Sequence, residues 1–228
     1  MTFQRYAIYY APPQGAEWSR FATAWLGWDM ETGQPVAHPD LDLPVPVAQI
    51  TATPRKYGLH GTIKPPFRLA PGTTVADLQQ ALQARCAAMP GIALAGLELS
   101  RLGRFLALRP VGNASALAQL AAGCVRDLDV FRAPASAAEL ARRRAKGLSP
   151  AQEDNLTRWG YPYVMDQFRF HITLTGRLDP EVLTPVTRAL DTALSPLLPA
   201  PFLIPDLALV GEDADGRFHL IHRYTLSG

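Results

Sequence analysis

The sequence of 228 residues is poor in cysteine, in charge and in long apolar runs. Its two cysteines, Cys86 and Cys124, lie within apolar helical patterns and form no C-x-x-C motif, so we expect two buried free thiols in a reducing compartment. No apolar run approaches the ~20 residues of a membrane span, and the first residues lack the charged-then-apolar pattern of a signal peptide. We therefore expect a soluble cytoplasmic protein with no membrane partner.

Charge is equally scarce, since charged residues make up 18% of the chain and the formal net charge is +2. That balance suits a small anionic substrate and is too weak to predict a nucleic-acid groove. The hydrophobic share of 48% is typical of a globular protein. The length allows one sizeable core, or two small lobes that share one.

One short motif occurs twice. The segments 59–63 and 170–174 both read apolar-His-x-Thr-apolar, and their histidines lie 111 positions apart. In an extended strand residues i and i+2 face the same side, so each segment presents one imidazole beside one hydroxyl. Given the numbers of His and Thr in the chain, chance predicts roughly 0.3 His-x-Thr matches. Two adjacent strands of this kind would gather two imidazoles and two hydroxyls on one patch.

The contexts of the two motifs also match. In each half we expect a strand, a helix, the His-x-Thr strand, a second helix and a two-strand hairpin. The second strand of each hairpin is expected to contribute to the other half. The segments 103–106 and 216–219 both begin with Gly-Arg-Phe, at an offset of 113. We therefore predict a duplicated α+β unit, with the two His strands together at the centre.

A basic run over 142–146 ends a short helix that begins at a predicted capping box, Ser136 to Glu139. Such a run is a candidate binding site for a chain of phosphate groups. Basic residues in the last turn of a helix also complement the helix dipole. We favour this second interpretation, a solvated basic face.

Two such motifs, one in each half of a duplicated α+β chain of this length, resemble the 2H phosphoesterase superfamily over essentially the whole chain. The stretches 53–64 and 156–164 resemble a narrower bacterial branch that is linked to phosphonate metabolism. The resemblance implies one bilobal domain over residues 1–228, with two antiparallel sheets lining a central cleft and helices packed outside. It also implies hydrolysis or ligation at cyclic phosphodiesters or at nucleotide and RNA ends, without a metal or another cofactor.

By motif match, the resemblance assigns His60 and His171 as catalytic residues and Thr62 and Thr173 as phosphate-binding residues. Opening a cyclic phosphodiester needs a base that takes a proton from water and an acid that protonates the leaving alkoxide. Histidine, with an unperturbed pKa of about 6.5, serves in either role near neutral pH. The threonine hydroxyls would donate to the non-bridging oxygens, where negative charge builds in the transition state. The motifs leave open which histidine is the acid.

A metal site is the competing use of paired histidines. Neither motif contains a carboxylate or a cysteine, and threonine is a poor ligand for zinc, so we expect no metal. Lys64 follows His60 by four residues on the same strand face and would reach the site from its rim, while Thr175 holds the equivalent place in the second half. This asymmetry would orient an asymmetric substrate. Further candidates for substrate binding flank the motifs: Arg55, Lys56, Tyr57, Tyr163 and Arg169.

These observations predict a metal-independent phosphodiesterase for a small cyclic phosphodiester of a sugar or nucleotide, linked to phosphonate breakdown. A second possibility is processing of RNA ends or oligonucleotides at 2′-5′ or 2′,3′-cyclic phosphates, which would require a longer basic groove than a net charge of +2 predicts. A third is a non-catalytic module that binds a phosphorylated metabolite. All three predict a phosphorylated ligand as the partner, and the pattern gives no oligomeric state.

Overall fold

The structure, a computed structural model, describes residues 2–145 and 147–228, so Lys146 of the basic run lies outside the described residues. The helices are α1 (Glu17–Leu26), α2 (Val47–Ile50), α3 (Val75–Ala87), α4 (Ser115–Asp127), α5 (Ala137–Arg144), α6 (Pro150–Trp159) and α7 (Pro180–Ala193). The strands are β1 (Arg5–Tyr10), β2 (Trp28–Asp29), β3 (Gln34–Pro35), β4 (Gly61–Phe67), β5 (Ile92–Leu94), β6 (Gly96–Leu102), β7 (Phe105–Val111), β8 (Ile172–Thr173), β9 (Phe202–Ile204), β10 (Asp206–Glu212) and β11 (Phe218–Thr225). Single 3-10 turns are η1 (Arg55–Tyr57), η2 (Asp129–Phe131), η3 (Met165–Gln167) and η4 (Ser195–Leu197).

Seven antiparallel strands form the central sheet, in the order β11-β10-β1-β4-β8-β7-β6. The two motif strands, β4 and β8, are neighbours at its centre and share one paired position, Gly61 with Ile172. The two sheets expected from the sequence are thus present as two groups of strands that one residue pair joins into a continuous sheet. The α+β class is confirmed.

Each motif strand lies in the part of the sheet that contains a hairpin from the other half of the chain. Strand β8, which comes late in the sequence, pairs with β7 of the β6–β7 hairpin. Strand β4 pairs with β1, and β1 pairs with β10 of the β10–β11 hairpin. This interleaving of the two halves is what places the motifs next to each other.

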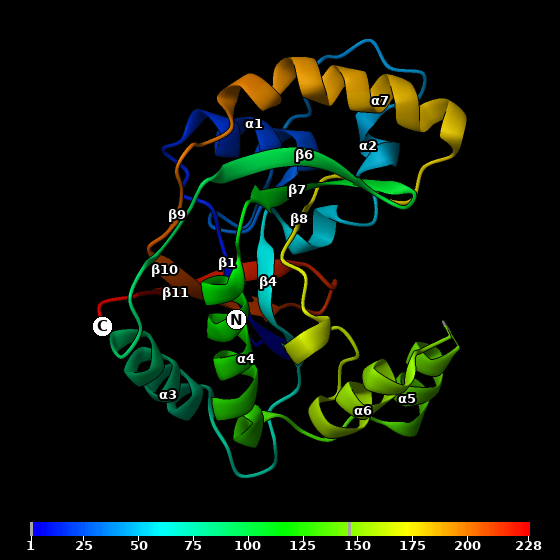
Figure 1. The fold of residues 1–228 in the computed structure, drawn as a ribbon. Helices are drawn as coiled ribbons and strands as arrows, with labels where there is room; N and C mark the ends of the chain where they lie inside the picture. The colour runs from blue at the N-terminus through cyan, green and yellow to red at the C-terminus, as the bar shows by residue number, and fades with distance from the viewer. Residues whose placement is uncertain (1, 146) are drawn as a thin grey trace.

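Helices cover both ends of the sheet, as Figure 1 shows. In this view α1, α2 and α7 lie together above β6 and β7, whereas α3 and α4 lie below, where α3 contacts β11 and α4 contacts β4. The pair α5 and α6 projects at the lower right, away from the sheet. Among the helices of the described residues, none is long and apolar enough to cross a membrane.

Strand β1 is buried on both of its faces. Ile8 and Tyr10 belong to the main hydrophobic core, while Ala7 and Tyr9 belong to a smaller cluster that includes Phe218. Successive side chains of a strand point to opposite faces of the sheet. Tyr9 is therefore directed to the same face as Thr62, with which it is paired on β4.

Candidate active site

A cavity of about 680 Å³ lies over the junction of β4 and β8. Its volume is within the range of about 300–1,000 Å³ that is typical of small-molecule sites. Both His-x-Thr motifs contribute to its wall. The lining residues come from the sheet and the segments beside it, from η1 and its flanks, from α5 and from the loop after α6: Arg5, Tyr9, Thr53, Pro54, Lys56, Tyr57, Gly58, His60, Thr62, Pro65, Pro66, Arg142, Arg143, Tyr161, His171, Thr173 and Thr175.

The pairing of Gly61 with Ile172 sets how the two motifs face each other. Continuing that antiparallel register by one residue in each direction places Thr173 across from His60, and His171 across from Thr62. The two histidines then occupy diagonal positions, which in a sheet are roughly 7–8 Å apart. Both histidines line the same cavity, so the two rings border one shared space.

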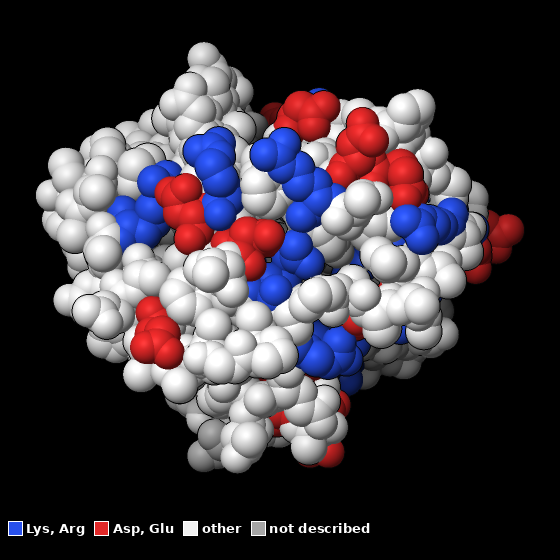
Figure 2. Space-filling view, turned by 90° about the horizontal axis from the view of Figure 1, so that it is seen from below, with Lys and Arg blue, Asp and Glu red and all other residues white. Residues whose placement is uncertain are grey.

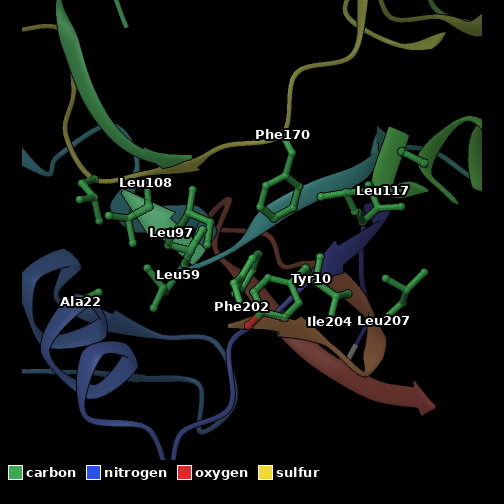
Figure 3. Packing of buried hydrophobic residues seen from close by; sticks show 14 of the residues in the cluster. Tyr10, Ala22, Leu59, Leu97, Leu108, Leu117, Phe170, Phe202, Ile204 and Leu207 are labelled. Carbon is green, nitrogen blue, oxygen red and sulfur yellow. The ribbon is translucent and has the colours of Figure 1, made fainter. Parts of the chain in front are cut away.

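The middle residue of the first motif is a glycine that leaves room for an aromatic ring. A Cβ atom at Gly61 would lie 2.2 Å from the ring of Phe170, the residue that precedes His171. Figure 3 shows the ring of Phe170 directed into the core toward Tyr10 and Phe202, and its centroid is 6.2 Å from each of theirs. The absence of a side chain at Gly61 thus lets the core-anchored ring of Phe170 pack directly against the backbone of β4.

The two imidazoles are held in the same way. Nδ1 of His60 lies 3.0 Å from the carbonyl oxygen of Gly58, and Nδ1 of His171 lies 2.8 Å from that of Arg169. A carbonyl oxygen only accepts hydrogen bonds, so Nδ1 carries the proton in each ring. In the neutral imidazole Nε2 is then the basic nitrogen. Gly58 has φ +68, a conformation that favours glycine, and a Cβ there would lie 2.9 Å from Met30.

Aromatic rings enclose the first histidine. The ring of Tyr9 stacks on the imidazole of His60 with centroids 3.9 Å apart, and Tyr57 approaches with centroids 5.9 Å apart. Burial, together with a smaller effect of the nearby His171, lowers the pKa of His60 to about 4, against the hydrogen bond to Gly58, which raises it. His60 is therefore neutral across the physiological pH range.

The hydroxyl groups of Thr62 and Thr175 differ in the hydrogen bonds that they form within the protein. Thr62 Oγ1 lies 3.1 Å from Nε2 of His60 and donates to it when that nitrogen is unprotonated. Thr175 Oγ1 accepts from the backbone N–H of Leu106 at 3.0 Å and donates to the carbonyl of Gly176 at 2.8 Å. Thr175 lines the cavity, as expected from the sequence, but its hydroxyl is engaged in holding β7 and the chain after β8.

The expectation that Lys64 faces the same side as His60 is wrong. Tyr9 pairs with Thr62, but Ile8 pairs with Lys64, so β4 contains one extra residue between these positions. Such a bulge reverses the alternation of side chains beyond it. Lys64 is 2% exposed and points into the opposite side of the sheet, where Nζ donates to the carbonyl of Val125 at 3.0 Å and lies 3.5 Å from Asp129.

Of the flanking candidates, Lys56 and Tyr57 line the cavity and the other three are not among its lining residues. Arg55 donates to the carbonyl of Leu26 and to the hydroxyl of Thr51. Tyr163 is 43% exposed, and Arg169 donates to two carbonyls of its own loop.

Sequence reasoning missed several lining residues. Arg142 and Arg143 belong to the basic run whose solvated interpretation we favoured. Arg142 is exposed, in keeping with that interpretation, Arg143 is half-buried, and both also line the cavity. Arg144 fits that interpretation, since it pairs with Glu153 at 2.7 Å on the surface. Tyr9 could have been found from the alternation of side chains along the first strand, whereas Tyr161 carries no signal in the sequence.

The cavity wall is basic. Its lining residues include four Lys or Arg side chains and no carboxylate or cysteine. Within residues 2–145 and 147–228, no group of three or more His, Cys, Asp or Glu is placed to hold a metal ion. On the face of the molecule seen from below, Figure 2 shows basic and acidic side chains interleaved, and they form no continuous basic band.

A family model described as "Protein of unknown function (DUF1045)" matches residues 62–219. The chain belongs to the DUF1045 family. The chain is also similar to two curated proteins named "Ribose 1,5-bisphosphate phosphokinase PhnN". One from Janthinobacterium sp. (strain Marseille) is 36% identical over 93% of the chain, and one from Laribacter hongkongensis (strain HLHK9) is 38% identical over 77%. The matches cover 48% and 40% of those proteins, so this DUF1045 chain spans about half their length or less.

Solved structures also match the DUF1045 chain from end to end. LigT of E. coli complexed with 3′-AMP has a TM-score of 0.44 at 18% identity and covers 100% of both chains. TT0787 of Thermus thermophilus has a TM-score of 0.46 at 16% identity and covers 98% of both. A structure described as a phosphoesterase has a TM-score of 0.42 at 19% identity and covers 99% of both.

Proposed function

We propose that this DUF1045 protein is a phosphodiesterase that opens a small cyclic phosphodiester by hydrolysis, with His60 and His171 as its proton-transfer groups. The observation that carries the proposal is the matched pair of imidazoles. Each has its Nδ1 bound to the carbonyl two residues earlier, and both rings line one cavity. Two fixed rings with available Nε2 atoms suit a reaction that needs a base on one side of phosphorus and an acid on the other.

The two roles follow from the surroundings of each ring. His60 has a pKa lowered to about 4, so its Nε2 is free to accept a proton from water near neutral pH. The water oxygen forms a bond to phosphorus while the bond from phosphorus to the leaving ring oxygen breaks. His171, in its protonated form, gives the proton at Nε2 to that leaving alkoxide. The product is a phosphate monoester with one free hydroxyl, and the two histidines have exchanged protonation states.

Thr62 and Thr173 support the same step. By the register of β4 and β8 each lies across from the histidine of the other motif. In the proposed mechanism their hydroxyls donate to the non-bridging oxygens, which gain negative charge in the transition state. In the free protein Thr62 is bonded to Nε2 of His60, and substrate would replace this contact. With no carboxylate or cysteine among the lining residues, the cavity offers a poor donor set for a metal, so we propose that none is used.

The names of the relatives guide the choice of substrate. Both are named as phosphokinases of ribose 1,5-bisphosphate, and both are about twice as long as the matched region or longer. The present chain contains no Gly-Lys dipeptide and hence no Gly-rich phosphate loop of the GxxxxGK type. We therefore assign the kinase activity to the part of the relatives that this chain does not match. The proposed substrate is a cyclic phosphodiester of a sugar phosphate or nucleotide, within phosphonate metabolism.

The single junction between β4 and β8 supports one further element of the proposal. With only Gly61 and Ile172 paired there, the strands on either side form two lobes of one domain over residues 1–228. The cavity lies where the two lobes meet. An active site at this position draws one histidine from each lobe.

Turnover of a panel of cyclic phosphodiesters tests the proposed function. The panel contains 2′,3′-cyclic nucleotides and cyclic phosphates of ribose, each assayed with and without a chelator. We expect His60→Gln and His171→Gln each to lose about 10²–10⁴-fold in kcat, the usual contribution of a proton-transfer group. His222→Gln is the matched control, because His222 is an exposed histidine of β11 outside the cavity. Activity that the chelator abolishes, or full activity in either cavity variant, would overturn the mechanism.

A further inference from the structure

The cavity extends beyond the two histidines to a basic end. Arg142 and Arg143, in the last turn of α5, line it together with Lys56 of η1. The proposed reaction at phosphorus uses the histidines and threonines of the two motifs. Lys56, Arg142 and Arg143 have no role in it. They are candidates for contact with a portion of the substrate that does not react.

These cations differ from the other basic residues of the cavity and of α5 in lacking an acidic partner. Arg5 is paired with Glu212, and Arg144 is paired with Glu153. For Arg142 and Arg143, the part of the chain that the structure describes provides no ion pair. Lys56 and Arg142 are exposed and Arg143 is half-buried, so an anionic ligand at this end of the cavity would meet cations that no carboxylate of the described residues neutralises.

Arg143 is the most constrained of the three. Its guanidinium lies over the ring of Tyr161, 4.6 Å from the ring centroid. Its Nε is buried and has no hydrogen-bond partner within the described residues. Arg143 also borders a water-sized cavity of about 30 Å³ between α5 and the loop after η2, so the side chain lines two spaces. A planar guanidinium held on an aromatic ring is prepared to bind an anionic group with two parallel hydrogen bonds.

The helix dipole does not account for this arrangement. It would favour basic residues in the last turn of α5 wherever they point. Arg144 shows the result expected from the dipole alone, a surface side chain that pairs with Glu153 of α6. Arg142 and Arg143 instead line the cavity.

The helices that carry the basic end are attached to the body of the protein. Glu139 of α5 forms an ion pair with Arg68, which lies just beyond β4. Arg132 donates to the carbonyl of Arg158 at the end of α6, and its Nη1 would lie 2.8 Å from a Cβ at Gly160. These contacts fix α5 and α6 in place, so the basic end has a set position relative to the motifs.

We propose that Arg142, Arg143 and Lys56 form a second anion subsite, and that the substrate is a cyclic phosphodiester that carries another anionic group, a phosphate or a carboxylate, at its non-reacting end. The inference rests on the proposed function and makes it more specific. The cyclic phosphate binds between the two histidines, and the second anion binds at the end of α5. The two charges together fix which bond of an asymmetric ring faces His171.

Three matched substrates test the subsite: adenosine 2′,3′-cyclic phosphate, its 5′-phosphorylated form, and its analogue with a 5′-carboxylate. The readout is the ratio of kcat/KM for each substrate with the added 5′ charge to that for the one without it. We expect the wild type to prefer a 5′-charged form, and Arg143→Gln to lower this preference about ten- to hundredfold, as is usual for hydrogen bonds to charged groups. Arg144→Gln removes a charge from the same helix turn outside the cavity, and should leave the preference unchanged. The 5′-charged form that the wild type prefers identifies the second group.

Equal turnover of the three substrates by the wild type would overturn the subsite, as would an equal loss of preference in Arg144→Gln. If no cyclic substrate is turned over, that result counts against the proposed reaction and not against the subsite. Binding of the same three compounds, measured by titration calorimetry, then decides the subsite. Tighter binding of a 5′-charged form that is lost in Arg143→Gln supports it, and equal affinities overturn it.

Discussion

The phenol ring of Tyr9 lies flat on the imidazole of His60, with centroids 3.9 Å apart and an angle of 24° between the planes. One face of the imidazole is thereby closed to water, and desolvation lowers the pKa of His60 to about 4. Because Tyr9 is itself buried in β1, the ring cannot move aside without disturbing the sheet. The stacking thus links the position of His60 on β4 to its protonation state.

The first prediction concerns the pH dependence of activity. If His60 is the base, kcat/KM rises with pH as its free-enzyme pKa is passed, near pH 4. In Tyr9→Leu the imidazole is better hydrated, so the rising limb should move upward toward pH 6.5, the unperturbed value for histidine. A pH–rate profile of both proteins checks this. Tyr163→Leu, which alters an exposed ring outside the cavity, is the control and should keep the wild-type profile; an unmoved limb in Tyr9→Leu contradicts the assignment.

The second prediction concerns the pH dependence of stability. The folded-state pKa of His60, about 4, is below its unfolded value of 6.5, so the unfolded chain binds more protons between these values. The contribution of His60 is fully present above pH 6.5 and is lost as pH falls toward 4. Between pH 7 and pH 5 the wild type should lose roughly 2 kcal/mol of unfolding free energy more than His60→Gln does. Urea unfolding at both pH values measures this, and identical losses in the two proteins would refute it.

The third prediction concerns the glycine between His60 and Thr62. Gly61→Ala brings a methyl group to 2.2 Å from the ring of Phe170, so the motif strands must separate or the ring must leave the core. We expect a loss of about 1–3 kcal/mol in unfolding free energy and a lower kcat. In the double variant Gly61→Ala with Phe170→Leu, the smaller side chain should restore part of the activity. Additive effects in the double-mutant cycle would show that the contact is not responsible.

Much of the site could be predicted from the sequence because it depends on short-range patterns. The two motifs, their strands and their shared α+β context follow from the period of two and the repeated order of elements. The side on which Lys64 lies could not be predicted, because it depends on a bulge in β4 that is visible only in its pairing with β1. The place of Arg143 likewise depends on long-range contacts such as Arg68 with Glu139, which no local pattern encodes.

The fourth prediction concerns Lys64. Burial lowers its pKa to about 8, against the attraction of Asp129, which raises it. The buried charge of Lys64 therefore reduces the free energy of unfolding at neutral pH. Lys64→Met keeps the size and leaves Asp129 bonded to Arg132. We expect unfolding free energy at pH 7 to stay equal or rise by up to ~3 kcal/mol, as for other buried ion pairs replaced by apolar side chains.

The pH dependence of this gain provides a second check. A lowered pKa means that the penalty is fully present below pH 8 and disappears as pH rises toward the unfolded value of 10.5. The advantage of Lys64→Met should therefore shrink over that interval. Its kcat/KM should stay close to that of the wild type, because Lys64 does not line the cavity. A tenfold loss of kcat/KM with the fold intact would instead support the substrate-binding role expected from the sequence.

The last prediction separates two threonines of one segment. Thr173 lines the cavity across from His60, whereas the hydroxyl of Thr175 is bonded to Leu106 and Gly176. Thr173→Val should lower kcat about 10²-fold, as for loss of one donor to a transition-state oxyanion, with little change in unfolding free energy. Thr175→Val leaves the buried N–H of Leu106 without its acceptor, so it should cost about 1–3 kcal/mol of stability.

The two variants are informative because valine has nearly the shape of threonine in both places. A loss of kcat in Thr173→Val at unchanged stability assigns the hydroxyl to the reaction, since packing is preserved. A loss of stability in Thr175→Val at preserved kcat assigns that hydroxyl to the attachment of β7. The opposite pattern would be a loss of kcat in Thr175→Val and a loss of stability in Thr173→Val. It would mean that Thr175, and not the residue that the register with β4 places across from His60, contacts the substrate.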